Sequence, residues 1–76
     1  MTADEMLEKL GYEKVEDERN CIIYINRKED KHLEFDLFTK QFGIREFGWG
    51  NFDFEYVTMQ ELKAINKKCE EMRWIE

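Results

Sequence analysis

Carboxylates two positions apart are the residues of this chain whose spacing could support chemistry. The segment "HLEFDLF" contains Glu34 and Asp36, and the segment "NFDFEY" contains Asp53 and Glu55. In a β-strand, residues two apart share one face and lie about 7 Å apart. Two such carboxylates act as acid and base only where their environment separates their pKa values. We expect all four to face water, so we predict no catalytic residue, no metal site and no cofactor.

The remaining reactive side chains also lack the patterns that catalysis or metal binding requires. His32 is the single histidine, and its neighbours Lys31 and Leu33 supply no nucleophile for it to activate. Cys21 and Cys69 form no metal-binding motif, and we expect buried thiols in a reducing compartment, although the sequence leaves a disulfide open. The chain is therefore predicted not to be an enzyme.

The charge balance narrows the class of partner. Eighteen acidic and twelve basic residues give a net charge of −6, and residues 1–18 alone hold seven acids against two bases. Such a negative field repels phosphate backbones and attracts basic protein surfaces. We therefore expect no direct contact with nucleic acid, although an aromatic sheet can stack bases. No apolar stretch approaches the length of a membrane span, so we expect a cytoplasmic protein without a membrane partner.

A loop rich in aromatic residues is the strongest candidate for partner binding. In "GWGN", Trp49 lies between two glycines and outside any periodic element, where a large ring is often a binding residue. Phe47 and Phe52 flank Trp49 and are candidates for the same anchor. The alternative is that Trp49 covers the edge of the core. Phe52, Phe54 and Tyr56 alternate at the period of a strand, and we expect their shared face to pack under the helices.

Two helices are predicted from their capping signals. The segments "TADE" and "TMQE" each place threonine at the N-cap and glutamate three residues later, where each side chain can bond the other residue's backbone N–H. The first helix is expected to end at Gly11, in the left-handed conformation, with Tyr12 folding back onto the last turn. The second helix carries an apolar stripe through residues 59–72 that should lie on a sheet.

The segments between the helices alternate with the period of strands. A short polar strand from Tyr12, then "CIIYIN", "HLEFDLF" and "TKQFGIREF", predict a meander that "GWGN" breaks. We expect the glycines, including Gly43, at the ends and turns of these elements. The helix-facing core is predicted to contain Leu7, Leu10, Ile23, Ile25, Leu33, Phe35, Leu37, Phe54, Leu62, Ile65 and Cys69. The other sheet face is predicted to carry Glu34, Asp36, Phe38, Asp53 and Glu55.

These elements predict one α+β domain over residues 1–76. It consists of an N-terminal helix, an antiparallel β-meander of three to four strands and a C-terminal helix. Both helices are expected on one face of the sheet, because each has a single apolar stripe to bury.

The two ends of the chain carry a resemblance. "EMLEKLGYEK" and "VTMQELKAINKKCEEMRWIE" resemble small accessory proteins encoded by phages and mobile elements of Gram-positive bacteria. In those proteins a helix ending in Leu-Gly-Tyr precedes a β-meander and a closing helix. The resemblance implies this fold and brings no functional residues with it. Such proteins are often inhibitors of host machinery, including CRISPR and other defence systems, so it implies an inhibitor in the cytoplasm of a host bacterium.

Taken together, these features predict a non-enzymatic protein-interaction module. We expect Trp49, with Phe47 and Phe52, to anchor a host protein. The acids expected to pair with lysines or arginines of a nucleic-acid-binding channel in that protein are Glu34, Asp36, Asp53 and Glu55. The second hypothesis is a structural homodimer that pairs through the open sheet face or a strand edge. A small enzyme acting through carboxylates is the third hypothesis and ranks last.

Overall fold

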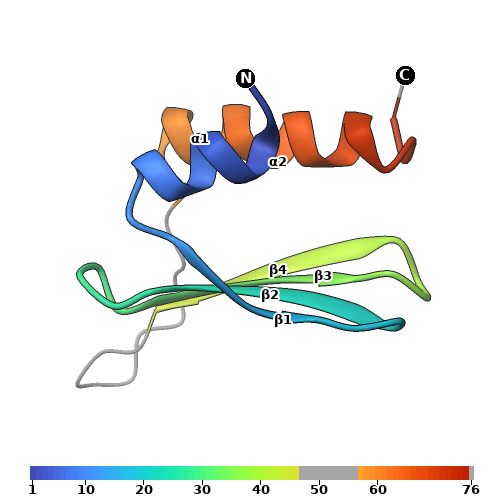
Figure 1. Cartoon of the computed structure of the whole chain (residues 1–76), viewed down its shortest axis with the longest axis horizontal. Helices are drawn as coiled ribbons and strands as arrows, with labels where there is room; N and C mark the ends of the chain where they lie inside the picture. The colour runs from blue at the N-terminus through green and yellow to red at the C-terminus, as the bar shows by residue number, and fades with distance from the viewer. Residues whose placement is uncertain (47–56, 76) are drawn as a thin grey trace.

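The chain forms a sheet with two helices side by side over one face (Figure 1). The computed structural model describes residues 1–46 and 57–75. In chain order the elements are α1 (Ala3–Lys9), β1 (Glu13–Asp17), β2 (Cys21–Asn26), β3 (Lys31–Asp36), β4 (Gln41–Glu46) and α2 (Met59–Glu71). The predicted α+β class, the antiparallel meander and the placement of both helices on one face are confirmed.

Local sequence explains where the helices begin and where α1 ends. Thr2 Oγ1 accepts from the Glu5 N–H at 3.2 Å, while Glu5 Oε1 accepts from the Thr2 N–H at 2.9 Å. The second predicted capping box opens α2 in the same way. Gly11 follows α1 with a φ of +101°, and the Tyr12 N–H donates to the Leu7 carbonyl at 3.0 Å. This is the helix stop that the sequence predicts.

The strands pair in chain order, and each pair is antiparallel. The register places Tyr24 opposite Leu33, and Leu33 opposite Ile44, so that these buried side chains line up beneath the helices. The turns on either side of β3 contain no glycine. Asp30 and Lys40 instead adopt the left-handed conformation, with φ of +53° and +58°.

The assignment of β2 to the core was wrong at two positions. Ile23 and Ile25 point away from the helices and are half-buried, because the register turns Ile22 and Tyr24 inward. "CIIYIN" is apolar on both faces, so alternation alone does not choose between them. The buried core consists of Leu7, Tyr12, Ile22, Tyr24, Leu33, Phe35, Ile44, Ala64, Ile65 and Cys69.

The remaining differences lie at the margin of the core. Leu62 was expected to be buried and is 38% exposed, because it stands on the flank of the α2 face that meets the sheet. Leu10 and Leu37 pack against the core from its edge and are half-buried. Phe54 lies outside the described residues.

Strand β1 forms one edge of the sheet and is irregular. The register shifts between Lys14 and Glu16, so that Val15 forms a β-bulge. All five residues of β1 are exposed, and four of them are charged. A bulge and charged side chains both discourage a further strand from adding to an edge.

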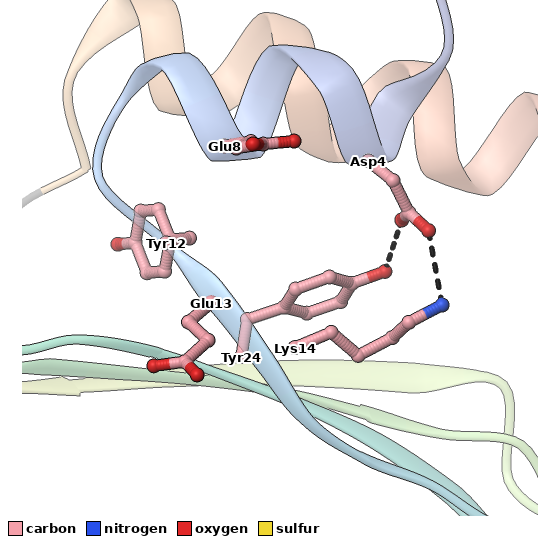
Figure 2. Close-up of a pocket in the computed structure, with 6 residues that line it drawn as sticks. All are labelled: Asp4, Glu8, Tyr12, Glu13, Lys14 and Tyr24. Carbon is pink, nitrogen blue, oxygen red and sulfur yellow. Dashed lines mark hydrogen bonds and ion pairs between the residues drawn. The ribbon is translucent and has the colours of Figure 1, made fainter.

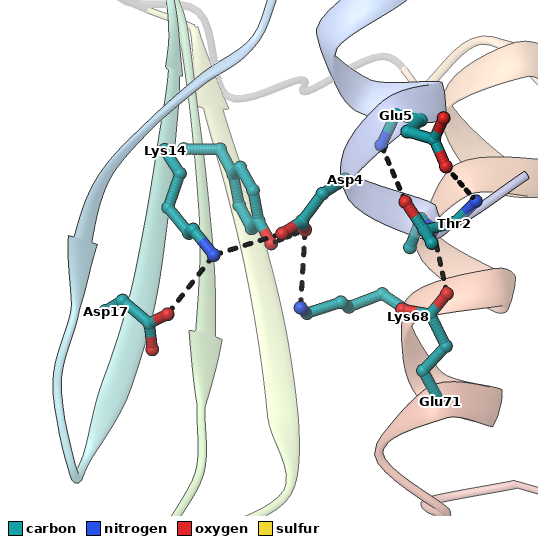
Figure 3. A network of polar contacts seen from close by, with 9 residues as sticks. Thr2, Asp4, Glu5, Lys14, Asp17, Lys68 and Glu71 are labelled. Atoms are coloured by element: carbon teal, nitrogen blue, oxygen red, sulfur yellow. Dashed lines mark hydrogen bonds and ion pairs between the residues drawn. The ribbon is translucent and has the colours of Figure 1, made fainter.

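A cluster of polar groups around Asp4 ties α1 to the sheet (Figure 2). Asp4 Oδ1 accepts from the Tyr24 hydroxyl at 2.5 Å, and Asp4 Oδ2 accepts from Lys14 Nζ at 3.0 Å. Lys68 of α2 approaches the same carboxylate at 3.4 Å. Figure 3 shows that α2 also caps α1, since Glu71 Oε2 accepts from the Ala3 N–H at 2.9 Å. These contacts hold both helices against one face and leave the other face of the sheet uncovered by them.

Candidate functional site

The sheet face turned away from α1 and α2 carries the acidic residues predicted on β3. Strand alternation and the register send every second residue of β2, β3 and β4 to this open face (Figure 1). The open face consists of Cys21, Ile23, Ile25, His32, Glu34, Asp36, Gln41, Gly43 and Arg45. Both described helices lie over the other face of the sheet, so neither of them packs on the open face.

Two isoleucines form the apolar part of the open face. Ile23 and Ile25 are both half-buried. The register places Glu34 beside Ile23 and His32 beside Ile25. An apolar centre with polar and charged neighbours is the composition of many protein interfaces.

An acidic hollow lies at one end of the open face. It has a volume of about 460 Å³ and is lined by Asn20, Cys21, Glu34, Asp36 and Phe38. The structure therefore brings the two predicted β3 carboxylates together with an aromatic ring. Phe38 is 87% exposed. Burying this ring against a partner would release ordered water, so Phe38 offers apolar surface that a partner could bury at this end of the sheet.

Asp36 is held in place at the acidic hollow. Its Oδ1 atom accepts from the Phe38 N–H at 2.9 Å and from the Thr39 N–H at 3.1 Å. The backbone N–H groups of Thr39 and Phe38 lower the pKa of the Asp36 carboxyl below its usual range. The group is therefore ionised and fixed in orientation at neutral pH.

The pKa of the Cys21 thiol reflects the negative charge around the acidic hollow. Burial raises the pKa of this thiol, and four surrounding carboxylates raise it further: Glu16, Glu18, Glu34 and Asp36. The ligand atoms of Glu16, Glu18 and Cys21 lie within 4.8 Å of one another, a spacing that a metal ion could bridge. Metal binding requires the thiolate, which this raised pKa disfavours. Cys21 and Cys69 are both free, with Cys69 buried in the core.

A second hollow on the open face is made by a missing side chain. It has a volume of about 330 Å³ and is lined by His32, Glu34, Gly43 and Arg45. No heavy atom lies within 4 Å of the position that a Cβ on Gly43 would occupy. The expectation that Gly43 ends an element was wrong, because it lies inside β4, opposite Glu34. A glycine inside a strand often marks a place where another group approaches closely. The position of Gly43 within the strand pattern was therefore the sequence signal for this hollow.

The structure describes two of the seven predicted site residues and shows on which face of the sheet they lie. Glu34 and Asp36 share the open face, as predicted. The other five lie outside the described residues and remain predictions: Phe47, Trp49, Phe52, Asp53 and Glu55. Sequence reasoning did not assign Cys21, Ile23 or Gly43 to the site, because their grouping depends on pairing between strands.

The hollow between α1 and β1 is the other candidate for chemistry (Figure 2). It has a volume of about 430 Å³, and its lining includes Asp4, Lys14 and Tyr24. Burial and the hydrogen bond to Asp4 raise the pKa of Tyr24. Burial alone would raise the pKa of Asp4, but hydrogen bonds from Tyr24 and Lys14 lower it overall. Both shifts move the pKa values away from neutral pH. The pair of Asp4 and Tyr24 is therefore suited to holding α1 in place rather than to exchanging protons.

Neither described helix is long and apolar enough to cross a membrane. Comparisons of this chain with protein-family models, with curated proteins and with solved structures found no match. A functional assignment therefore rests on the chemistry of the open face.

Proposed function

We propose that this chain is a non-enzymatic interaction module of a phage or mobile element that binds a basic surface of a host protein and inhibits it. The observation that carries the proposal is the acidic hollow on the open face, where Glu34 and Asp36 lie beside the exposed Phe38. Carboxylates around an apolar centre complement a surface of lysines and arginines. The resemblance of the chain ends to accessory proteins supplies the proposed origin and the proposed cytoplasmic location in a host bacterium.

Basic surfaces of this kind occur in channels that bind nucleic acid. An acidic protein face can occupy such a channel because its carboxylates take the positions of phosphate charges. Inhibition would follow from competition with the nucleic acid, without any chemical step. Trp49, flanked by Phe47 and Phe52, is proposed as an additional aromatic anchor, and Asp53 and Glu55 as additional acids.

A homodimer is the alternative function, and charge weighs against its use of the open face. A two-fold dimer through the open face would bring two copies of the same acidic hollow into one interface that excludes water, and the surplus of like charge opposes this pairing. The bulge in β1 also discourages pairing through that edge. A heterologous basic partner avoids both costs.

Affinity capture from a lysate of a host bacterium tests the proposal. The comparison is between the wild type, Glu34→Lys on the open face and Glu70→Lys on α2. Both substituted residues are exposed glutamates, and α2 lies on the opposite side of the sheet, so the second variant controls for net charge. We expect one basic protein to be retained by the wild type and by Glu70→Lys and lost with Glu34→Lys. Adding the wild type should then release nucleic acid from that protein.

Two results would refute the proposal. Equal retention by both variants would show that the open face does not bind the captured protein. An empty capture, with the wild type running as a dimer in light scattering, would favour the homodimer instead.

A further inference from the structure

We infer that the acidic hollow binds the guanidinium group of an arginine side chain presented by the partner protein. This inference rests on the proposed function and names the chemistry that the open face recognises. Three features meet at this end of the sheet: a pair of carboxylates on β3, an exposed ring in the following turn, and a surplus of negative charge.

The two carboxylates have the spacing of a guanidinium site. Glu34 and Asp36 are alternate residues of one strand, about 7 Å apart along it. A guanidinium group has five N–H donors in one plane, so it can donate to two carboxylates on opposite sides at once. Both backbone hydrogen bonds of Asp36 go to Oδ1, so Oδ2 can accept from a ligand. Within the described part of the chain, the Glu34 carboxylate makes no hydrogen bond or ion pair.

The ring of Phe38 supplies the third side of the site. It lines the same hollow and is 87% exposed, so its face can take a planar cation without rearrangement of the core. Arginine stacks on aromatic faces and is weakly hydrated, whereas the compact ammonium of lysine holds its water more tightly. The combination of a ring and paired carboxylates therefore favours arginine over lysine.

The surrounding charge makes the hollow selective for a cation. Glu16 and Glu18 at the end of β1 add their field to that of the two β3 carboxylates. Among the described residues, none that lines the hollow is basic. An arginine entering here neutralises charges that now repel each other, which adds to the attraction.

An NMR titration tests the inference with a defined probe. The peptide Gly-Gly-Arg-Gly-Gly is added to the isotope-labelled protein at low salt, beside matched peptides that contain lysine or citrulline, the neutral analogue of arginine. We expect the arginine peptide to shift the amide signals of residues that line the hollow, such as Cys21, Glu34 and Phe38. We expect weaker shifts with lysine and none with citrulline.

Two substitutions of exposed residues establish the contacts. Phe38→Ala should weaken arginine binding about two- to fivefold, the loss of one exposed cation–π contact. Glu34→Gln should weaken it by about the same factor, the loss of one exposed charge pair. Glu70→Gln on α2 is the matched control and should leave the affinity unchanged. All three sites are exposed, and unchanged signals of the core residues will show that each variant folds.

The inference is overturned if lysine and arginine peptides bind equally, if Phe38→Ala has no effect, or if the shifts spread over residues 1–18. Zinc that shifts the signals of the hollow while arginine does not would also overturn it and would indicate a metal site. These results are separable from a failure of the proposed function. If capture of the host protein requires Glu34 but arginine peptides do not bind, only the arginine site is refuted. If capture is unaffected by Glu34→Lys, the proposed interaction surface itself is refuted.

Discussion

Replacing Glu61 with glutamine tests the buried ion pair that joins α2 to the sheet. Glu61 Oε1 accepts from Lys31 Nζ at 2.9 Å and from the Thr58 N–H at 2.8 Å, and the Tyr12 hydroxyl donates to Oε2. The side chains of Lys31 and Glu61 are 9% and 6% exposed. Glutamine keeps the size of the side chain and can keep the capping bond. It leaves the lysine ammonium buried opposite a neutral amide.

The expected loss is a large share of the stability of the domain. Removing one partner of a buried ion pair costs about 3–5 kcal/mol, because the lysine ammonium loses the carboxylate that it faces. A domain of this size has a free energy of unfolding of about 4–11 kcal/mol. Each kcal/mol lowers the Tm by about 4–8 °C, so the Tm should fall by about 12 °C or more. Urea denaturation followed by circular dichroism measures the loss directly, and a change below about 1 kcal/mol would refute the ion-pair account.

A double substitution separates charge from shape. Lys31→Met combined with Glu61→Gln removes both charges, and we expect it to recover part of the stability that the single variant loses. If the double variant is no more stable than Glu61→Gln alone, the loss comes from packing or from the Tyr12 contact rather than from the broken ion pair between Lys31 and Glu61.

The same carboxylate should make stability depend on pH. Burial alone would raise the pKa of Glu61, but the Thr58 N–H, the Tyr12 hydroxyl and Lys31 lower it overall. Because the pKa of Glu61 is lower in the folded state, the ionised carboxylate stabilises the fold at pH values above the unfolded pKa of about 4.3. This stabilisation is lost as the pH falls through the folded pKa. We therefore expect a constant urea midpoint from about pH 7 to pH 5 and a decline below about pH 4. Glu61→Gln should have a shallower decline, and an equally steep one would contradict this assignment.

Further substitutions test the core, the glycines and the aromatic anchor. Phe35 is fully buried, so Phe35→Ala should lower the free energy of unfolding by about 3–5 kcal/mol. Phe38 is exposed, so Phe38→Ala should change it by less than about 0.5 kcal/mol. An unchanged Tm for Phe35→Ala would disprove the assignment of Phe35 to the core. Gly43→Ala should raise the free energy of unfolding measured in urea by about 0.5–1 kcal/mol, because glycine weakens the interior of a strand and the added methyl group meets no neighbouring atom. Gly11→Ala should destabilise, since its φ is +101°. Trp49→Ala should abolish partner capture without lowering the Tm, and retained affinity would end its role as an anchor.

Features set by neighbouring residues were predictable from the sequence. The capping boxes and the stop at Gly11 depend on residues within a few positions of one another, and all are present. The alternation in "HLEFDLF" correctly sent Glu34 and Asp36 to one face, because apolar and acidic residues strictly alternate there.

Features set by contacts between distant segments were not predictable in the same way. The inward face of β2 carries Tyr24 and Asn26, whose polar atoms find partners across the fold. Tyr24 donates to Asp4 at 2.5 Å, and Asn26 Nδ2 donates to the Leu10 carbonyl at 2.9 Å. Both hollows of the open face likewise depend on which residues the register places opposite one another, such as Glu34 and Gly43. No local pattern specifies that pairing.

The cap that Glu71 places on α1 constrains the order in which the chain folds. With seven residues, α1 is too short to be stable alone, and its Ala3 N–H is satisfied by a carboxylate 68 positions further along. During synthesis, α1 therefore emerges from the ribosome well before the residues that stabilise it. The sheet can assemble first, but the helical layer closes only after α2 has been translated. A truncation within α2 should consequently unfold the opposite end of the sequence as well.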